Sequence, residues 1–348
     1  MVSRFHLGLV LTIAVGCGQP SEPPPSSVAT APPIPAGVLT IGSVSLNPTQ
    51  EYEVVRPFAD FVAANLHHVG IGRGRVVVVG SLNQMIEELR KGRVDLLIDS
   101  PFPAVFVWQH TDVQPILRRW KRGSDVYRSV VFARADSGVD SVEDLAGKII
   151  AFGEPFSTSG FLMPKAALTS AGLRLVNYED PAASIPGDRV GYIFSNDAEN
   201  TMFWVLKRKV VAGSVNADYF KALAGDRISE LRILLTTEAV PRNVVSVRRD
   251  LDPKVVQAIE SLMLEMHLSD EGRTSLEKFE ETTRFDRFPG GADQDLLIGH
   301  DGEDNLNGQG GSPDTLVGSD AFDILNDNAG SDLVDNTFAF VADWIDAA

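Results

Sequence analysis

Three consecutive hydroxyl residues and a glycine, Ser157–Gly160 (sequence STSG), form the stretch of this chain best suited to chemistry. They follow an apolar run at residues 148–152, which is typical of a buried strand, and precede a helical pattern at about residues 160–171. The first N–H groups of a helix lack partners within the helix and carry the positive end of its dipole. Hydroxyl donors at that position therefore predict a site for a small oxyanion. The alternative is an ordinary N-cap, because Ser and Thr cap many helices.

The elements that must position this stretch alternate along the chain in two blocks. The first block predicts strands at residues 38–42, 75–79, 94–99 and 127–133, and helices at residues 54–66, 82–91 and 101–108. The second predicts strands at residues 149–152, 191–195 and 210–215, and helices at residues 160–171 and 197–207. Further strands at residues 233–236 and 243–247 precede helices at residues 253–266 and 270–278. Such alternation indicates parallel sheets covered by helices.

This order predicts an α/β protein of two lobes joined by two crossings. We expect residues 38–133 to form the first part of lobe 1, residues 134–231 to form lobe 2, and residues 232–289 to return to lobe 1. In open α/β sheets, ligands bind beyond the carboxyl ends of the strands, where Ser157–Gly160 is expected. A cleft between the lobes that closes by a hinge is the expected binding site.

The N-terminus has the pattern of an export signal. Arg4 precedes a short apolar stretch at residues 7–14, and small residues lead to Cys17, the single cysteine of the chain. This stretch is too short for a stable transmembrane helix. It resembles the leader of a bacterial lipoprotein, in which the Cys17 thiol would be lipidated; the alternative is plain secretion. Residues 18–37 are rich in Pro, Ser and Ala, which predicts an extended tether.

The acidic charge of the chain is concentrated at its C-terminal end. Residues 290–348 hold 13 of the 47 acidic residues and none of the 31 basic ones, so the preceding part is close to neutral. This distribution argues against a nucleic-acid partner. A small basic cluster at residues 118–122 is interpreted as a solvated turn, with a docking patch as the alternative.

Several segments resemble one known family in their order along the chain. They include residues 47–52, Arg56-Pro57-Phe58, residues 92–95, 127–130, 134–138 and 144–148, the segment from Phe156 to Gly160 followed by Pro164, and residues 285–291. Together they resemble the phosphate/phosphite/phosphonate-type substrate-binding proteins of bacterial ABC transporters, which have the type II periplasmic-binding-protein fold.

The resemblance implies a ligand site and a set of partners. It implies ligand contacts from these residues: Ser157, Thr158, Ser159, Gly160, Tyr127, Ser129, Asn196, Ser100 and Thr49. It also implies a monomeric binding protein, without a cofactor in its body, that delivers a small oxyanion to an ABC permease from the periplasmic or envelope side of a membrane. Tyr127 could instead be a packing residue, and Pro101 could serve only to begin a helix.

The departures from the family pattern bear on the ligand. Asn196 stands where phosphonate-binding members often have histidine, and Pro103 and Ala104 follow Phe102 where an aromatic residue is usual. Asn216 and Asp218 are the only candidates near the position of the acid that holds an amino group. We therefore expect phosphate, phosphite or a simple phosphonate rather than an aminophosphonate.

The acidic tail shows a repeat. An acid followed by apolar residues recurs every nine residues at Asp314, Asp323 and Asp332. This resembles degenerate RTX repeats, which form calcium-binding β-rolls. The resemblance implies candidate Ca²⁺ ligands at Asp295, Asp301, Asp304, Asp323 and Asp332. The alternative is a disordered acidic tail.

Catalysis finds no support in the sequence, which lacks a G-x-S-x-G elbow, an H-E-x-x-H motif and a P-loop. His67 and His68 are adjacent on the chain and are interpreted as surface residues rather than metal ligands. The function expected first is that of a solute-binding lipoprotein. The alternatives are a periplasmic sensing module for a membrane sensor kinase, and an adhesive protein whose calcium tail carries the function.

Overall fold

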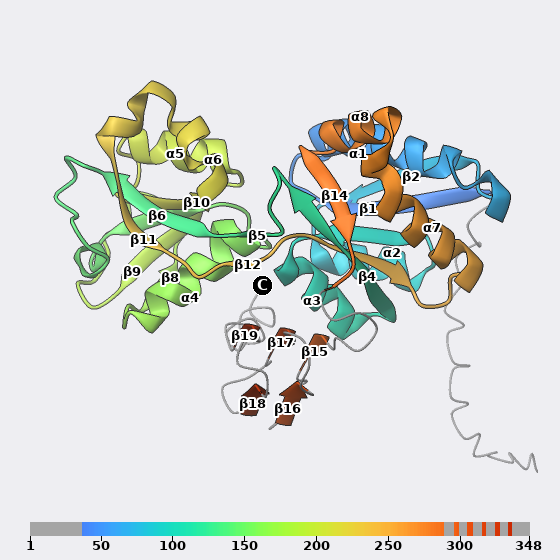
Figure 1. Ribbon diagram of the computed structural model, residues 1–348. Helices are drawn as coiled ribbons and strands as arrows, with labels where there is room; N and C mark the ends of the chain where they lie inside the picture. The colour runs from blue at the N-terminus through green and yellow to red at the C-terminus, as the bar shows by residue number, and fades with distance from the viewer. Residues whose placement is uncertain are drawn as a thin grey trace, which may run out of the picture. The chain divides into compact units, whose positions relative to one another are not determined.

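The computed structural model describes residues 37–288 and five short strands within residues 296–335 (Figure 1). The expected leader at residues 1–17, with Cys17, lies outside the described residues, and so does the tether except for residue 37. None of the helices in residues 37–288 combines the length and the apolarity that a membrane crossing requires.

Two six-stranded sheets form the two lobes. The first has the order β14-β4-β13-β3-β1-β2, with strands β1 Val38–Val44, β2 Arg73–Val79, β3 Leu96–Asp99, β4 Val113–Lys121, β13 Val244–Arg248 and β14 Thr282–Asp286. The second has the order β11-β6-β10-β7-β9-β8, with β6 Ser129–Arg134, β7 Ile149–Phe152, β8 Leu175–Asn177, β9 Val190–Phe194, β10 Ala212–Asn216 and β11 Leu231–Thr236. The predicted α/β fold is confirmed, but the sheets are mixed: β13 runs antiparallel to β3 and β4, and β6 runs antiparallel to β10 and β11.

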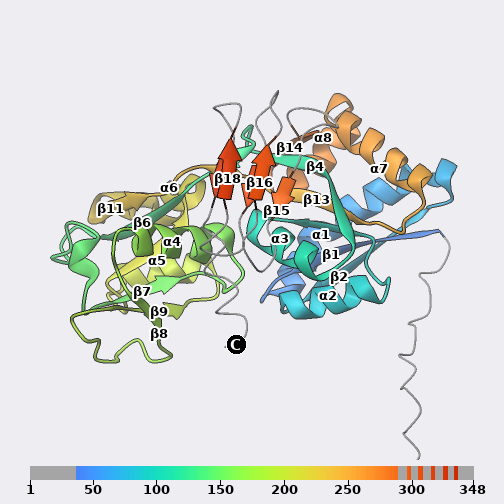
Figure 2. The same cartoon turned by 90° about the horizontal axis from the view of Figure 1, so that it is seen from below.

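Helices cover both faces of each sheet (Figure 2). In lobe 1, α1 Pro48–Ala64, α7 Pro253–Glu265 and α8 Asp270–Lys278 pack on one face, and α2 Leu82–Arg90 and α3 Pro101–His110 pack on the other. In lobe 2, the helical turn η3 Thr158–Leu162 and α4 Met163–Ser170 cover one face, and α5 Ala198–Leu206 and α6 Ala217–Ala224 cover the other. Short helical turns lie at η1 His67–Val69, η2 Glu143–Leu145, η4 Gly225–Glu230 and η5 Met266–Leu268.

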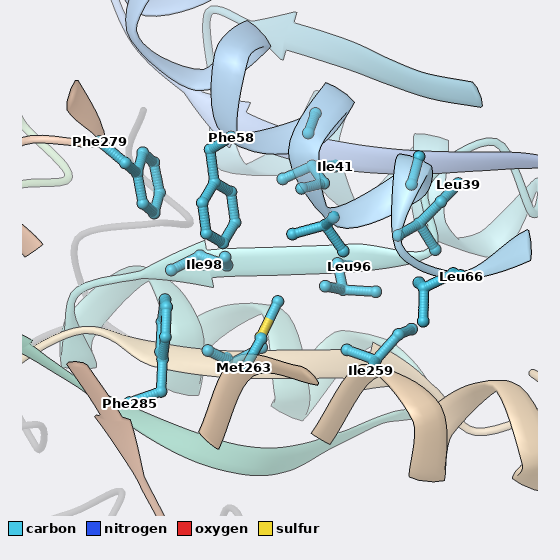
Figure 3. Close-up of a cluster of buried hydrophobic side chains, with 14 of the residues drawn as sticks. Leu39, Ile41, Phe58, Leu66, Leu96, Ile98, Ile259, Met263, Phe279 and Phe285 are labelled. Carbon is cyan, nitrogen blue, oxygen red and sulfur yellow. The ribbon is translucent and has the colours of Figure 1, made fainter. Parts of the chain in front are cut away.

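The lobe 1 core explains why α1 forms where it does. Its apolar residues recur at helical spacing, so that Val55, Phe58 and Val62 share one buried face. The Phe58 ring is fully buried, and its centroid lies 4.3 Å from the stacked ring of Phe279 and 5.9 Å from that of Phe285 (Figure 3). This contact joins the first helix to residues near the end of the body, so Phe279 and Phe285 share the lobe 1 core with α1.

The strand pairing places the boundaries of the two lobes at other residues than the sequence predicts. β6 and β11 were expected in lobe 1, but both pair within the second sheet. The crossings are instead the short strands β5 Val126–Tyr127 and β12 Val240–Pro241, which pair with each other antiparallel. The strand expected at residues 127–133 is thus two strands, interrupted at Arg128. The expected boundaries at residues 133 and 232 are therefore wrong by one strand at each crossing.

The basic cluster at residues 118–122 is also corrected. Residues 118–121 belong to β4, and only Arg122 lies at the following turn. Arg119 is 1% exposed and pairs with Glu280, which also pairs with Lys121. Arg118 pairs with Asp286 of β14. The partner carboxylates neutralise the cluster, which explains how charged residues can occupy a strand within the sheet.

The described part of the tail consists of five short strands. Strands β15 Leu296–Ile298, β17 Thr315–Val317 and β19 Leu333–Asp335 pair parallel in one sheet, and β16 Asn305–Gly308 pairs parallel with β18 Ile324–Asp327 in another. Two parallel ladders built from alternate short strands are compatible with the expected roll. The five candidate calcium ligands, Asp295, Asp301, Asp304, Asp323 and Asp332, lie outside the described residues.

Candidate functional site

The start of the helical segment after β7 is held by a cap and by a hydroxyl from β6. The Ser157 Oγ accepts a hydrogen bond from the Gly160 N–H at 2.9 Å, so the N-cap interpretation holds for this side chain. A Cβ on Gly160 would lie 2.8 Å from Ser157 Oγ, which is why a glycine stands there. The Ser129 hydroxyl donates to the Ser159 carbonyl at 2.7 Å. Ser129 therefore positions the turn through the Ser159 carbonyl.

The same arrangement leaves donors at the tip of the turn. The N–H groups of Thr158 and Ser159 are the first two of the helical segment, and no acceptor for them occurs among the described residues. Such N–H groups and the positive end of the helix dipole favour a negatively charged oxygen. The cap and the predicted anion site are therefore compatible, because the cap uses only the Gly160 N–H.

The start of α3 in lobe 1 meets this turn directly. The Thr158 hydroxyl donates to Ser100 Oγ at 2.9 Å and accepts from the Phe102 N–H at 3.0 Å. Phe156 and Leu162 of lobe 2 also pack into the apolar cluster that contains Phe102. In this conformation the Thr158 side chain joins the two lobes, a role that the sequence did not reveal.

Tyr127 brings an additional donor to the same place. Its side chain belongs to the crossing strand β5 and is 7% exposed, and its hydroxyl is buried without a hydrogen-bond partner among the described residues. The hydroxyl lies near those of Ser100 and Thr158, and burial raises the pKa of the phenol above its usual value. Arg242 stands over the ring at 5.3 Å. A buried phenol hydroxyl is costly without an acceptor, so this group can donate to an acceptor placed beside the hydroxyls of Ser100 and Thr158.

Three carboxyl groups near the site act on one another: Asp99 and Glu51 of lobe 1, and Glu154 of lobe 2. Desolvation by burial raises the pKa of Asp99, at the end of β3, to about 8, although its residue is partly exposed. Burial likewise raises the pKa of Glu154, which follows β7, to about 7. Burial also raises the pKa of Glu51 on α1, where Ser43 Oγ donates to the Glu51 carboxyl at 2.5 Å. These acids were not predicted, although Asp99 precedes Ser100 at the carboxyl end of a strand.

A small polar cavity of about 130 Å³ adjoins these acids within lobe 1. Glu51 and Asp99 line it together with Arg119 and Glu280. Desolvation would raise the pKa of Glu280, but the charges of Arg119 and Lys121 outweigh it and lower that pKa to about 2. Glu280 therefore stays ionised, and its charge is already matched by two cations.

The other residues expected at or near the site are Asn196, Thr49, Asn216 and Asp218. Asn196 lies beside the turn, because its N–H donates to the Gly153 carbonyl at 3.3 Å, and its φ of 73° is a left-handed conformation that Asn tolerates. Thr49 is exposed on the first turn of α1, and its side chain makes no hydrogen bond among the described residues. Asn216 caps α6 by accepting from the Asp218 N–H, and the Asp218 carboxylate pairs with Arg242. Both acceptors near that position are therefore already used.

No group of three or more His, Cys, Asp or Glu side chains in residues 37–288 is arranged to hold a metal ion. His67 and His68 are exposed on η1, as expected for surface residues. Within this part of the chain, the arrangement is suited to non-covalent capture of an anion.

Comparison with protein families agrees with this geometry. Residues 43–295 match the model of the family described as "ABC transporter, phosphonate, periplasmic substrate-binding protein". The chain belongs to this family. Its members are binding proteins rather than enzymes, and a periplasmic or envelope location follows from the family.

Solved structures agree with the fold of this phosphonate-type binding protein. XAC2383 from Xanthomonas citri, solved with chloride, is 27% identical, with a TM-score of 0.69 over 73% of this chain and 92% of that chain. PhnD1 from Prochlorococcus marinus, solved with methylphosphonate, is 19% identical, with a TM-score of 0.58 over 72% of this chain and 93% of that chain. The predicted type II binding-protein fold is thus confirmed.

Two curated relatives match shorter stretches. The tetrathionate sensor histidine kinase TtrS of Salmonella typhimurium is 29% identical over 169 residues, which are 46% of this chain and 28% of that protein. The phosphate-import protein PhnD of Mycolicibacterium smegmatis is 34% identical over 94 residues, which are 26% of this chain and 29% of that protein. The matches span less than a third of the length of either relative.

Proposed function

We propose that this binding protein captures a small phosphorus oxyanion between its lobes and delivers it to an ABC permease. The observation that carries the proposal is a cluster of donors around Thr158: the N–H groups of Thr158 and Ser159, and the buried Tyr127 hydroxyl beside the Thr158 hydroxyl. Ser100 adds a hydroxyl from the other lobe. The bound methylphosphonate of PhnD1 and the bound chloride of XAC2383 support an anion as the ligand.

The ligand in this proposal is phosphate, phosphite or a simple phosphonate. In lobe 2, Asp218 is paired with Arg242, so it is not available to hold the amino group of an aminophosphonate. Asn196, whose amide can both donate and accept, suits an oxyanion that carries a proton. Isothermal titration calorimetry of the protein against phosphate, phosphite, methylphosphonate and aminoethylphosphonate tests the proposal. At least one of the first three should bind with micromolar affinity or better, and failure of all four would refute anion capture.

Thr158→Val should weaken anion binding by about 1–3 kcal/mol, because valine removes both hydroxyl contacts between the lobes and leaves the Phe102 N–H without its acceptor. Thr169→Val is the matched control, since the Thr169 hydroxyl donates only to the Lys165 carbonyl of its own helix. Calorimetry with the tightest of the four anions measures both variants. Equal affinities for the two would show that Thr158 has no part in closing the site on its ligand.

A sensing module for a membrane kinase is the second candidate, and the match to TtrS favours it. The two candidates share the fold and the site, so ligand binding cannot separate them. Purification of the protein together with its membrane partner would separate the two candidates. Recovery of an ABC permease would support delivery, and recovery of a sensor kinase would support signalling.

The membrane anchor and the calcium tail remain parts of the proposal that rest on the sequence. Cys17 would carry the lipid that holds the protein at the membrane, since it is the single cysteine and follows an export signal. The acidic repeats would bind Ca²⁺ through Asp295, Asp301, Asp304, Asp323 and Asp332. A titration of the whole protein with CaCl₂, compared with a chain ending at residue 289, would detect this binding as heat present only in the longer chain.

A further inference from the structure

The Asp99 carboxyl lines the small lobe 1 cavity and is linked to the site through Ser100, which accepts from Thr158. Its hydrogen-bond donors among the described residues are the N–H of Ser100, at 2.7 Å, and the Ser100 hydroxyl, at 3.4 Å, both to Oδ1. Oδ2 therefore has capacity for a further partner. The next residue, Ser100, accepts from Thr158, and the charge of Asp99 acts on the buried Tyr127 hydroxyl. Asp99, Ser100, Tyr127 and Thr158 thus form one cluster.

The surroundings of Asp99 disfavour its ionised form. The groups that face it are Glu51 from α1, Glu154 after β7, Tyr127 from β5, and Arg119 and Glu280 across the small cavity. Arg119 pairs with Glu280, and its charge lowers the pKa of Glu51 by less than burial raises it. An anion bound at the Thr158 and Ser159 N–H groups would add another negative charge beside this carboxyl. Two such charges at hydrogen-bond distance repel each other unless a proton lies between them.

We propose that Asp99 and the bound oxyanion share one proton between Asp99 Oδ2 and a ligand oxygen. This inference rests on the proposed function and names the form in which the ligand is held: a hydrogen oxyanion beside a carboxylate, or a full oxyanion beside a carboxylic acid. The two forms contain the same atoms and the same charge. The site would therefore take oxyanions that can accept or carry a proton, and binding would be linked to pH.

The sign of the linkage follows from where the proton is before binding. Below about pH 8 the free Asp99 holds its own proton, because its pKa is raised to about 8, and binding a full oxyanion requires none from solution. Above that pH both Asp99 and the free oxyanion are ionised, so each binding event must take up one proton. The affinity of the wild type should then fall about tenfold for each pH unit.

Asp99→Asn is the variant that tests this sharing. Asparagine keeps the Oδ1 acceptor for the Ser100 N–H and places an amide donor, which does not titrate, where the shared proton would lie. Between pH 8 and pH 9 the affinity of the wild type for methylphosphonate should fall about tenfold relative to that of the variant, because only the wild type needs a proton from solution.

Titration calorimetry with methylphosphonate and with phosphite, in two buffers of different ionisation heat, gives affinity and proton uptake together. At pH 9 we expect close to one proton per anion for the wild type and none for Asp99→Asn. Glu51→Gln is a second variant. Loss of a like charge should lower the pKa of Asp99, so the affinity of this variant should begin to fall at a lower pH than that of the wild type. Circular dichroism checks that each variant is folded.

The outcomes separate this inference from the proposed function. Parallel pH profiles for the wild type and Asp99→Asn, or no proton uptake at pH 9, would overturn the shared proton while leaving anion capture intact. Tighter binding of aminoethylphosphonate than of methylphosphonate, lost in Asp99→Asn, would also overturn it, since Asp99 would then hold an ammonium group. Absence of binding by the wild type at every pH would overturn both.

Discussion

Ser159→Asp should abolish anion binding while leaving the protein folded. The new carboxylate would lie in the first turn of the helical segment, next to the N–H groups of Thr158 and Ser159, where it would repel an anionic ligand. Like charges at a binding site cost several kcal/mol, so the affinity should fall by at least two orders of magnitude. The same carboxylate at a helix start should stabilise the fold by about 0.3–1 kcal/mol. A loss of binding without a loss of stability is the expected signature.

The matched control is Ser170→Asp, at the last residue of α4. It adds the same charge to the same helical segment at its other end, where Ser170 is exposed. Calorimetry with methylphosphonate and thermal melts of both variants make the comparison. If Ser159→Asp bound the anion as tightly as Ser170→Asp, the anion site would have to lie elsewhere on the protein.

Phe58→Ala should have the largest effect on stability. The ring is fully buried in the lobe 1 core and stacks on Phe279, so its removal leaves a cavity between the first helix and the end of the body (Figure 3). Phe→Ala changes in well-packed cores cost about 3–5 kcal/mol. Equilibrium unfolding in urea measures the change in the free energy of unfolding.

Phe203→Ala provides the comparison, because Phe203 on α5 is 55% exposed. Its free energy of unfolding should change by no more than about 0.5 kcal/mol. If both alanine variants unfolded at the same urea concentration, the contact between α1 and the returning segment could not be a main support of lobe 1.

Much of the fold could be predicted because the strands and helices show local patterns of apolar residues. Strand β7 is an unbroken apolar run, and α1 shows its buried face at helical spacing. The crossing strands could not be located in this way. β5 has two residues and is separated from β6 only by Arg128, so the sequence reads as one strand.

Strand β4 was missed for a different reason. Its last residues carry Arg118, Arg119 and Lys121, which by local pattern resemble a surface turn. Their partner carboxylates, Glu280 and Asp286, come from the far end of the body. A buried basic residue is compatible with a strand only when such partners are present, and sequence distance hides them.

The sequence predicts one part of the candidate site and not the other. The turn at Ser157–Gly160 could be predicted because hydroxyl residues after a strand and before a helix are a local signal. The unpartnered state of the Tyr127 hydroxyl depends on three-dimensional burial. The approach of Asp99, Glu51 and Glu154 depends on three separate elements, and no local pattern links them.

The most direct test of the account is a crystal structure of the protein with methylphosphonate. We predict an anion whose oxygens accept hydrogen bonds from the Thr158 and Ser159 N–H groups and from the Tyr127 hydroxyl. An anion in the large groove of about 950 Å³ lined by Arg90, Lys91 and Arg248, at the opposite ends of the lobe 1 strands, would contradict it. So would a complex in which the Tyr127 hydroxyl remains without a partner.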